Sequence, residues 1–333
     1  AYGRCEVLGE VYQERRREMR KHLLLILLIS CAAVAVRAQG LYVKVFGPKD
    51  GVPLVFLHGG PGYNAAMFES VAAQTLADSG FRVLVYDRRG EGRSVSTPAH
   101  YTFAEALGDL DSLCRTCDLR RPILLGHSFG GMLALLYADK YPDRVQSVVL
   151  VGAPVALQET FGNIRARCRA LYEERADSLN LKYIDMLDAM DKSSLEYASY
   201  CFMHAMANGF YTPKNPSKEG LAVRDEFKAD SALSRVSQEP NWQAPQGFHR
   251  SEHYTMLDLT DTLRRIIDRG TPVYGLYGAE DGLYSAGQLE TLRRILSPER
   301  MLTLDSCSHN VFLDRRRAFV DAVTRWCRVP DER

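Results

Sequence analysis

Six short apolar segments recur along the chain, with helical patterns between them. The apolar segments are rich in Val, Ile and Leu without clean alternation, which is typical of strands buried on both faces of a sheet. They are residues 52–57, 81–86, 122–127, 147–152, 272–277 and 301–304. The helical patterns include residues 102–117, 130–141 and 286–297. This alternation predicts an α/β fold with a mostly parallel, doubly wound sheet.

The alternation stops over residues 156–255. This stretch is helical, rich in Tyr, Met and Phe, and carries one loop signal, YTPKNPSKEG at 211–220. It is too long for a loop in a compact domain. Because such sheets bind ligands at the carboxyl ends of their strands, we favour an inserted helical lid over helices that only thicken the core. The core would then comprise residues 39–155 and 256–333.

Residues 19–38 have the pattern of a signal peptide. Arg20 and Lys21 precede an apolar stretch, residues 23–36, and Ala38 supplies a small residue for cleavage. The apolar stretch is shorter than the roughly 20 residues that span a bilayer. We therefore expect export to the periplasm or secretion, with no membrane span in the mature form.

Two further interpretations concern the same end of the chain. Residues 28–31 resemble a lipoprotein processing site, so attachment of the mature chain through Cys31 is the alternative to a free form. The apolar stretch continues past Cys31, which favours cleavage after Ala38. Residues 1–18 precede the signal and begin without Met, and we interpret them as not native.

Composition and charge restrict the partners. Of the 333 residues 46% are hydrophobic, enough for a large core, and 42 Lys plus Arg against 41 Asp plus Glu give a formal net charge of +1. That balance offers no electrostatic reason to expect nucleic acid as a partner. Export would permit disulfides among the six cysteines after residue 38. The single C-x-x-C, Cys114 to Cys117, lies on a predicted helix, so we expect structural thiols and no metal.

One motif indicates a nucleophile. The sequence Gly126-His-Ser128-Phe-Gly130 lies between the predicted strand at 122–127 and the predicted helix at 130–141. This is the context of a nucleophile elbow, whose sharp turn needs small neighbours and projects the Ser hydroxyl above the sheet. A serine becomes nucleophilic when an imidazole takes its proton and an acid orients that imidazole.

Chain order restricts the two partners of Ser128, because the acid and then the histidine follow the serine in such folds. Asp281 lies in the turn after the strand at 272–277, and His309 is the only one of eight histidines beyond it. Glu280 is the competing acid. His127 adjoins the nucleophile but would point away from it.

A glycine-rich turn, HGGPG at 58–62, follows the first predicted strand. Glycines let backbone amides approach either a phosphate or the oxyanion of an acyl-transfer reaction. Neither G-x-x-x-x-G-K-[ST] nor G-x-G-x-x-G occurs in the chain, so we favour the oxyanion. We assign the oxyanion hole to the amides of Gly60 and Phe129, and expect His58 and the DRRGEGRS segment at 87–94 to support the loop.

From residue 41 to 327 the chain resembles an α/β-hydrolase, and HGGPG is most similar to the prolyl aminopeptidase (proline iminopeptidase) family. Three other segments match that family's motifs: DRRGEGRS at 87–94, GHSFGG at 126–131 and GAED at 278–281. The resemblance implies an α/β-hydrolase fold without a cofactor. It also implies three roles, nucleophile for Ser128, orienting acid for Asp281 and general base for His309.

The resemblance also implies how a substrate amine is bound. Prolyl aminopeptidases bind the α-ammonium group with lid carboxylates, commonly a glutamate beside paired tryptophans. The expected lid has a single tryptophan, Trp242. Glu196 is the best candidate for the amine ligand, with Glu252 second.

Three functions stay open at this point. The first is an exported aminopeptidase that releases N-terminal proline or small apolar residues from small peptides. The second is an esterase or lipase-like hydrolase of acyl esters. The third is a binding protein that keeps the fold without turnover, and the complete Ser, Asp, His set in the right order argues against it.

Overall fold

The structure, a computed structural model, describes residues 34–35 and 40–327. Val34–Ala35 form the short strand β1. Residues 1–18 and, apart from these two positions, the predicted signal peptide with Cys31 lie outside the described residues.

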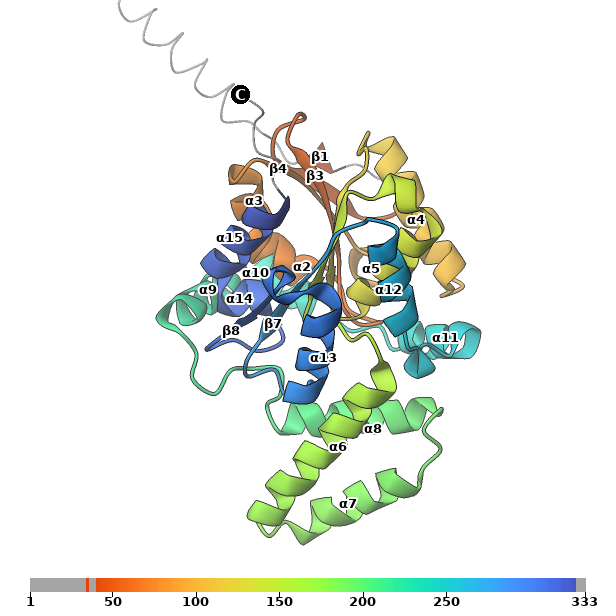
Figure 1. The fold of residues 1–333 in the computed structure, drawn as a ribbon, viewed down its shortest axis with the longest axis vertical. Coiled ribbons are helices and arrows are strands. Elements are labelled where there is room, and N and C mark those ends of the chain that lie inside the picture. Colours follow the sequence, from red (N-terminus) through yellow and green to blue (C-terminus); the bar gives the residue numbers. More distant parts are fainter. Residues whose placement is uncertain (1–33, 36–39, 328–333) are drawn as a thin grey trace, which may run out of the picture. The chain divides into compact units, whose positions relative to one another are not determined.

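Seven strands within residues 40–327 form one sheet in the order β2-β4-β3-β5-β6-β7-β8 (Figure 1). They are β2 (Val43–Phe46), β3 (Val52–Leu57), β4 (Phe81–Tyr86), β5 (Ile123–His127), β6 (Ser147–Val151), β7 (Val273–Gly278) and β8 (Met301–Leu304). Only β2 runs antiparallel to its neighbour; the other pairs of these seven are parallel. The six predicted strands are thus confirmed to within one residue at each end, and β2 was not predicted.

The register of the central strands aligns the loops that matter for chemistry. Leu57 at the end of β3 pairs with Gly126 of β5, and His127 pairs with Val151 at the end of β6. Parallel strands bring their carboxyl ends to one edge. The HGGPG loop, the GHSFG turn and the loop after β6 therefore begin side by side.

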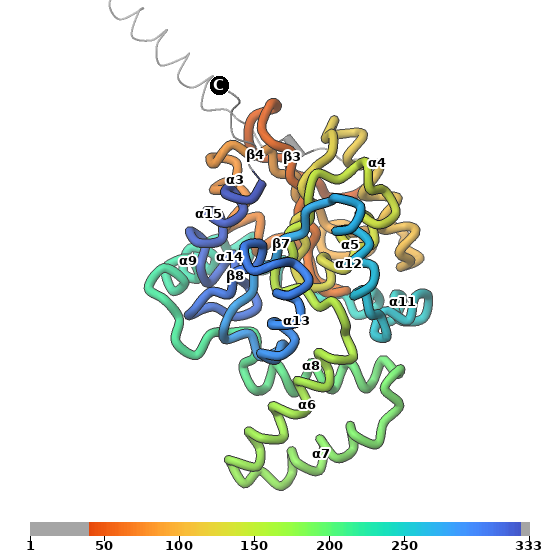
Figure 2. Tube along the Cα trace, in the orientation of Figure 1, coloured from red at the N-terminus to blue at the C-terminus, as the bar shows by residue number. Residues whose placement is uncertain are grey.

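Helices cover both faces of the sheet (Figures 1 and 2), as a doubly wound fold requires. One face carries α4 (Phe103–Thr116), α5 (Phe129–Lys140), α12 (Thr260–Asp268) and α13 (Ala286–Leu296). The other carries α2 (Ala66–Phe68), a π-helical turn (Glu69–Ala73), α3 (Gln74–Asp78), α14 (Val311–Asp314) and α15 (Arg316–Cys327). On this second face Phe56 of β3 stacks on Phe68, with ring centroids 3.7 Å apart. The predicted fold class is confirmed.

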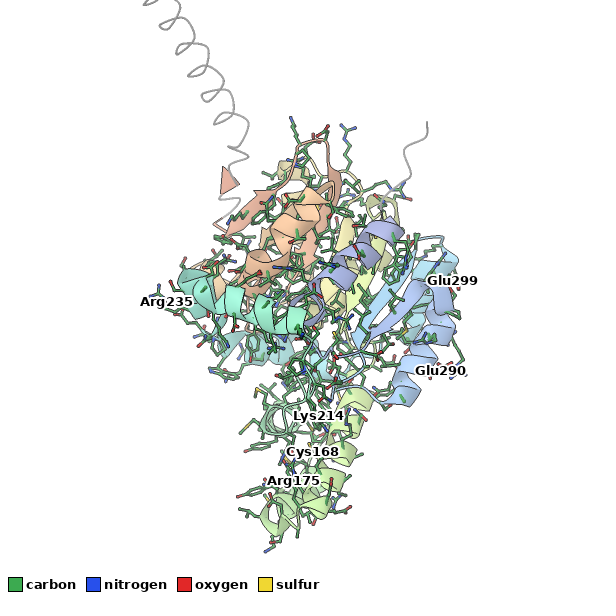
Figure 3. The ribbon with its side chains drawn as sticks, turned by 90° about the vertical axis from the view of Figure 1, so that its left-hand side faces the viewer. Cys168, Arg175, Lys214, Arg235, Glu290 and Glu299 are labelled. Carbon is green, nitrogen blue, oxygen red and sulfur yellow. The ribbon has the colours of Figure 1, made fainter. Side chains whose placement is uncertain are left out.

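The segment between β6 and α12, called here the inserted segment (residues 156–255), has two structurally different parts. It contains α6 (Leu157–Glu174), α7 (Ser178–Ala189), α8 (Leu195–Ala207), α9 (Lys218–Ala229), α10 (Ser231–Ser237) and α11 (Gln243–Glu252). Helices α6, α7 and α8 project away from the sheet, where Figure 3 labels Cys168 and Arg175. In contrast, α9 packs against α14 and α15, and α10 against α2. The two parts therefore differ in position: α6, α7 and α8 stand away from the sheet, whereas α9 and α10 pack on the core.

The cysteines of residues 40–327 are all buried and free: Cys114, Cys117, Cys168, Cys201, Cys307 and Cys327. Burial raises the pKa of the Cys114 and Cys168 thiols to about 12. These side chains are therefore neutral packing groups near pH 7.

Candidate active site

Ser128 occupies the sharp turn between β5 and α5. Its backbone has φ 52° and ψ −125°, and such a positive φ is uncommon outside glycine. The turn is possible because Gly126, Gly130 and Gly131 around it lack side chains. A Cβ added to Gly130 would lie 2.1 Å from the carbonyl oxygen of Leu57, and one on Gly131 would lie 2.3 Å from Ala153 Cβ. This is the geometry of a nucleophile elbow.

Asp281 and His309 follow β7 and β8 and are hydrogen-bonded to each other. Nδ1 of His309 lies 2.9 Å from Oδ2 of Asp281, and the other carboxylate oxygen accepts from the Leu283 amide at 3.0 Å. The two side chains belong to residues only 3% and 4% exposed. A carboxylate acceptor at Nδ1 keeps the proton there, so Nε2 is left as the basic nitrogen.

The competing acid, Glu280, is engaged elsewhere. Its Oε2 accepts from the amides of Lys214 at 2.5 Å and Asn215 at 3.3 Å, both in the inserted segment. The structure therefore pairs Asp281, not Glu280, with His309.

His127 links the elbow to the loop that carries His309. Its Nε2 lies 3.2 Å from the carbonyl oxygen of His309, and the two rings are 4.9 Å apart at their centroids. Burial and the nearby His309 lower the pKa of His127 to about 3, so a neutral imidazole donates Nε2–H to that carbonyl. The sequence offered no sign of this contact beyond the neighbouring position of His127 and Ser128.

A buried ion pair holds the HGGPG loop. Arg88 and Glu91 are 3% and 0% exposed, with Nη2 and Oε2 2.9 Å apart. Arg88 also donates to the carbonyl oxygen of Gly59 at 2.7 Å, and Glu91 accepts from the amide of Gly62 at 2.9 Å. The loop is thereby fixed on both sides of Gly60.

His58 adds a further support to the same loop. Its Nε2 accepts from the Arg88 amide at 3.0 Å, and its Nδ1 donates to the Gly59 carbonyl at 2.9 Å. Burial, with Arg88 close by, holds the pKa of His58 well below its usual range. His58 and the DRRGEGRS segment thus make structural contacts.

The amides of Gly60 and Phe129 are free to bind an anion. Within residues 40–327, neither amide donates a hydrogen bond to a protein acceptor. The glycine loop also passes close to the elbow, because a Cβ on Gly59 would lie 3.1 Å from Ser128 Cβ. Two unpaired amides beside a serine in a strained turn are suited to stabilising an oxyanion.

The two glutamates expected to bind a substrate amine are placed differently. Oε1 of Glu252 accepts from the Phe103 amide at 2.6 Å and so satisfies the first turn of α4. Glu196 is exposed in the first turn of α8. Next to His309 the inserted segment places Tyr211 instead, with the two rings perpendicular and 5.2 Å apart. Tyr211 was not singled out from the sequence.

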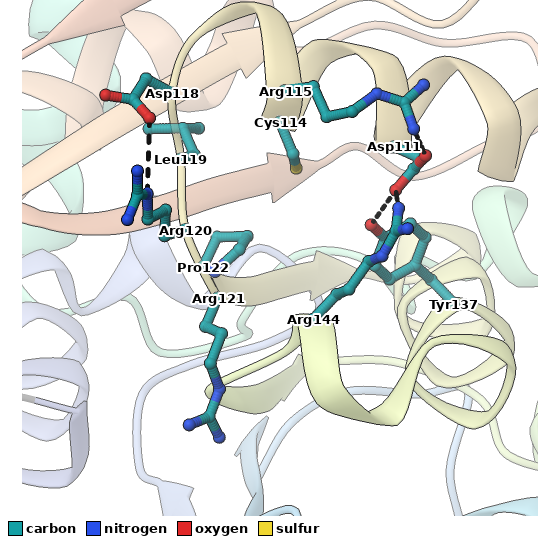
Figure 4. Close-up of a pocket in the computed structure, with 10 residues that line it drawn as sticks. All are labelled: Asp111, Cys114, Arg115, Asp118, Leu119, Arg120, Arg121, Pro122, Tyr137 and Arg144. Carbon is teal, nitrogen blue, oxygen red and sulfur yellow. Dashed lines mark hydrogen bonds and ion pairs between the residues drawn. The ribbon is translucent and has the colours of Figure 1, made fainter.

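A pocket of about 310 Å³ lies at the end of β5 opposite to Ser128 (Figure 4). Two arginines, Arg115 and Arg144, pair there with Asp111, while Arg120 pairs with Asp118. The pocket has no histidine, and its one cysteine is the neutral thiol described above. Both of its carboxylates, Asp111 and Asp118, are thus paired with arginines. Among the residues that the structure describes, no group of His, Cys, Asp and Glu is arranged to hold a metal ion.

Comparison with known proteins assigns the family. Residues 52–316, more than half of the chain, match the family model described as the alpha/beta hydrolase fold. The proline iminopeptidase PfmaB of Pestalotiopsis fici is 25% identical over 293 residues, covering 87% of this chain and 96% of that protein.

Solved structures agree with this assignment. A proline iminopeptidase-related protein from Thermus thermophilus has 26% identity and a TM-score of 0.58, covering 86% of this chain and 92% of that one. An esterase from Exiguobacterium antarcticum, 20% identical with a TM-score of 0.55 and covering 87% and 96%, shares the fold. The chain belongs to the α/β-hydrolase fold family.

Proposed function

We propose that the chain is a serine hydrolase in which Ser128 is the nucleophile, His309 the general base and Asp281 the acid that orients His309. One observation carries the proposal. The buried Asp281–His309 hydrogen bond of 2.9 Å lies at the edge of the sheet where Ser128 occupies a positive-φ turn. Hydrolysis by a serine nucleophile uses a base that takes the serine proton and an acid that orients the base.

The reaction follows from these positions. His309 Nε2 takes the proton of Ser128 as its Oγ attacks the substrate carbonyl, and Asp281 stabilises the imidazolium. The oxyanion accepts hydrogen bonds from the amides of Gly60 and Phe129. His309 then protonates the leaving group, and the same base activates the water that releases the acyl group.

We further infer that the substrate is a small peptide with an N-terminal proline or another small apolar residue. Two features support this substrate class: the HGGPG loop and the similarity to the proline iminopeptidase relatives reported above. Phe129 also lies in an aromatic cluster, 5.3 Å from the Phe248 ring and 5.5 Å from the Tyr254 ring. All three side chains are buried, so this cluster fixes the position of the Phe129 amide.

The charged amine of such a substrate separates a peptidase from an esterase. Glu196 is exposed and stays our candidate for binding it. A charge-assisted contact is worth about 1.5–3 kcal/mol, or roughly one to two decades in rate if realised in the transition state. Prolyl and alanyl arylamides should therefore be cleaved one to two decades faster than their N-acetylated forms.

Substitutions sharpen this experiment. Glu196→Gln should slow cleavage of the free-amine substrates and leave short acyl esters unaffected. The matched control is Glu174→Gln, another exposed carboxylate of the projecting helices, which should change neither rate. Failure of the free-amine substrates to be preferred would contradict the peptidase assignment.

An esterase is the second candidate, and one structural feature favours it. Glu252 and Glu280 are both occupied by backbone amides, so two carboxylates of this region are not free for an amine. Equal rates on free and acetylated substrates, with faster turnover of short acyl esters, would identify this function.

We also infer that the protein is exported through residues 19–38, with attachment at Cys31 as the alternative. In residues 40–327 no helix combines the length and apolar character needed to cross a membrane. When the chain is expressed from Met19, mass spectrometry of the exported product should find Gln39 at its N-terminus. An intact signal on the isolated protein would contradict export, and a lipid on Cys31 would identify the tethered form.

A further inference from the structure

The loop that carries the proposed acid is held from two sides. This acid loop comprises residues 280–282. The amides of Glu280 and Asp281 donate to carbonyl oxygens of the core, those of Cys307 and Gly278. The Glu280 carbonyl and the Asp281 carboxylate also bond within the core, and the other polar groups of the acid loop bond to the inserted segment.

Phe210 is the closest of these contacts. Its carbonyl oxygen accepts from the amide of Gly282, immediately after Asp281, at 2.9 Å. The same oxygen accepts from the hydroxyl of Ser308, immediately before His309, also at 2.9 Å. One backbone carbonyl of the inserted segment therefore joins the loops that carry the acid and the base.

Packing leaves little freedom at this junction. A Cβ added to Gly282 would lie 2.2 Å from Cγ of Phe210, so the ring lies directly on the glycine. The next residue, Tyr211, packs its ring edge-on against that of His309. Phe210 therefore packs against the residue after Asp281, and Tyr211 packs against His309 itself.

Helix α6 supplies two side chains to the same loop. Nδ2 of Asn163 donates to the Gly282 carbonyl at 3.2 Å, and Nη1 of Arg167 donates to the Asp281 carbonyl at 3.4 Å. The Arg167 guanidinium also lies 4.9 Å from the centroid of the Phe210 ring. The two donors are one helical turn apart on α6 and so reach neighbouring carbonyls.

The side chain of Glu280 completes the attachment. It accepts from the amides of Lys214 and Asn215, which follow Phe210 in the chain. Figure 3 labels Lys214 where the projecting helices join the rest of residues 40–327. All three residues of the acid loop are therefore bonded to the inserted segment.

We propose that the inserted segment positions the catalytic acid and base, with Asn163, Arg167 and Phe210 as positioning residues for Asp281 and His309. This inference rests on the proposed function. It assigns the inserted segment a role in the catalytic step in addition to any contact with substrate. Misplacement of a catalytic group by about 1 Å can cost a hundredfold in rate, because the reacting groups must be aligned.

The test compares substitutions on α6 that remove bonds to the acid loop with one that does not. The double variant Asn163→Ala/Arg167→Met removes both side-chain bonds to the acid loop. The control is Arg169→Met, because Arg169 pairs with Asp185 and Asp188 of α7 and not with the acid loop. For the double variant we expect kcat to fall about tenfold or more with KM nearly unchanged. The control should keep the parent values of both.

A second readout needs no substrate. The proton on Nδ1 of His309, bonded to Asp281, gives a downfield ¹H NMR signal that His309→Gln identifies by its loss. This signal should shift or broaden in the double variant and stay in place in Arg169→Met. The conservative variant Arg167→Lys keeps a donor at this position and should retain most of the parent kcat. An unmoved signal in a folded double variant overturns the inference, even if the parent hydrolyses no substrate and the proposed function fails.

Discussion

Two buried histidines lie beside the proposed nucleophile in the neutral state. His58 and His127 are 1% and 9% exposed. Burial is the main cause of their lowered pKa, with Arg88 adding to it for His58 and His309 for His127. Each imidazole donates one N–H to a backbone carbonyl. Its role in the site is therefore to hold the neighbouring backbone in position.

These neutral histidines make the protein sensitive to acid. Unfolding returns each to a pKa of about 6.5, so the unfolded state binds more protons below that pH. The stability contributed by each group is complete above about pH 6.5 and falls as the pH falls, by about 1.4 kcal/mol per pH unit.

Urea denaturation measures this effect directly. The free energy of unfolding should decrease from about pH 7 to about pH 5. His127→Gln keeps a donor for the His309 carbonyl but does not titrate, so its slope between about pH 6 and 5 should be smaller by about 1.4 kcal/mol per unit. An identical slope in parent and variant would mean that His127 is not held neutral.

The two neighbouring acids, Asp281 and Glu280, predict opposite kinetic outcomes. Asp281→Asn removes the charge that stabilises the imidazolium and should lower kcat on the order of 10³- to 10⁴-fold. Glu280→Gln keeps an oxygen to accept from Lys214 and should leave kcat near the parent value. Steady-state kinetics of the two variants decides between them, and a large loss in Glu280→Gln alone would reverse the assignment.

At the scale of elements, the elbow depends on close contact between β3 and α5. Gly130 lies against the last carbonyl of β3, where a methyl group would meet a backbone oxygen at 2.1 Å. Gly108, on the exposed side of α4, has no atom within 4 Å of an added Cβ. Both are helical glycines, but only Gly108 has room for a methyl group.

Alanine at each position should therefore act in opposite directions. Gly130→Ala should lower the free energy of unfolding by about 1–3 kcal/mol, because β3 or α5 must move. Gly108→Ala should raise it by about 0.5–1 kcal/mol, since alanine favours the helix. Chemical denaturation gives both values. Equal tolerance of the two substitutions would show that the elbow is looser than described.

At the scale of the whole molecule, the sequence predicts best what depends on local pattern. The six buried strands were recognisable because apolar residues occupy both faces. β2 was missed because it is only four residues long and has a lysine at its second position. The Ser128, Asp281 and His309 set followed from motif and chain order, and the structure brings the last two into contact.

Contacts that involve the backbone of a distant residue could not be predicted. Phe210 acts through its carbonyl on Gly282, which is 72 positions further along the chain, and no side-chain pattern reports such a bond. Glu252 reaches the Phe103 amide across 149 positions. The helical pattern of residues 156–255 also could not show that α9 packs on the core while α6 projects.

The central claim is that Ser128 is the nucleophile, and covalent labelling tests it most directly. A fluorophosphonate probe should react with the protein, and peptide mass spectrometry should place the adduct on Ser128. Ser128→Ala should remain folded, take up no probe and lose turnover. An adduct on another residue, or unchanged hydrolysis by Ser128→Ala, would contradict the account.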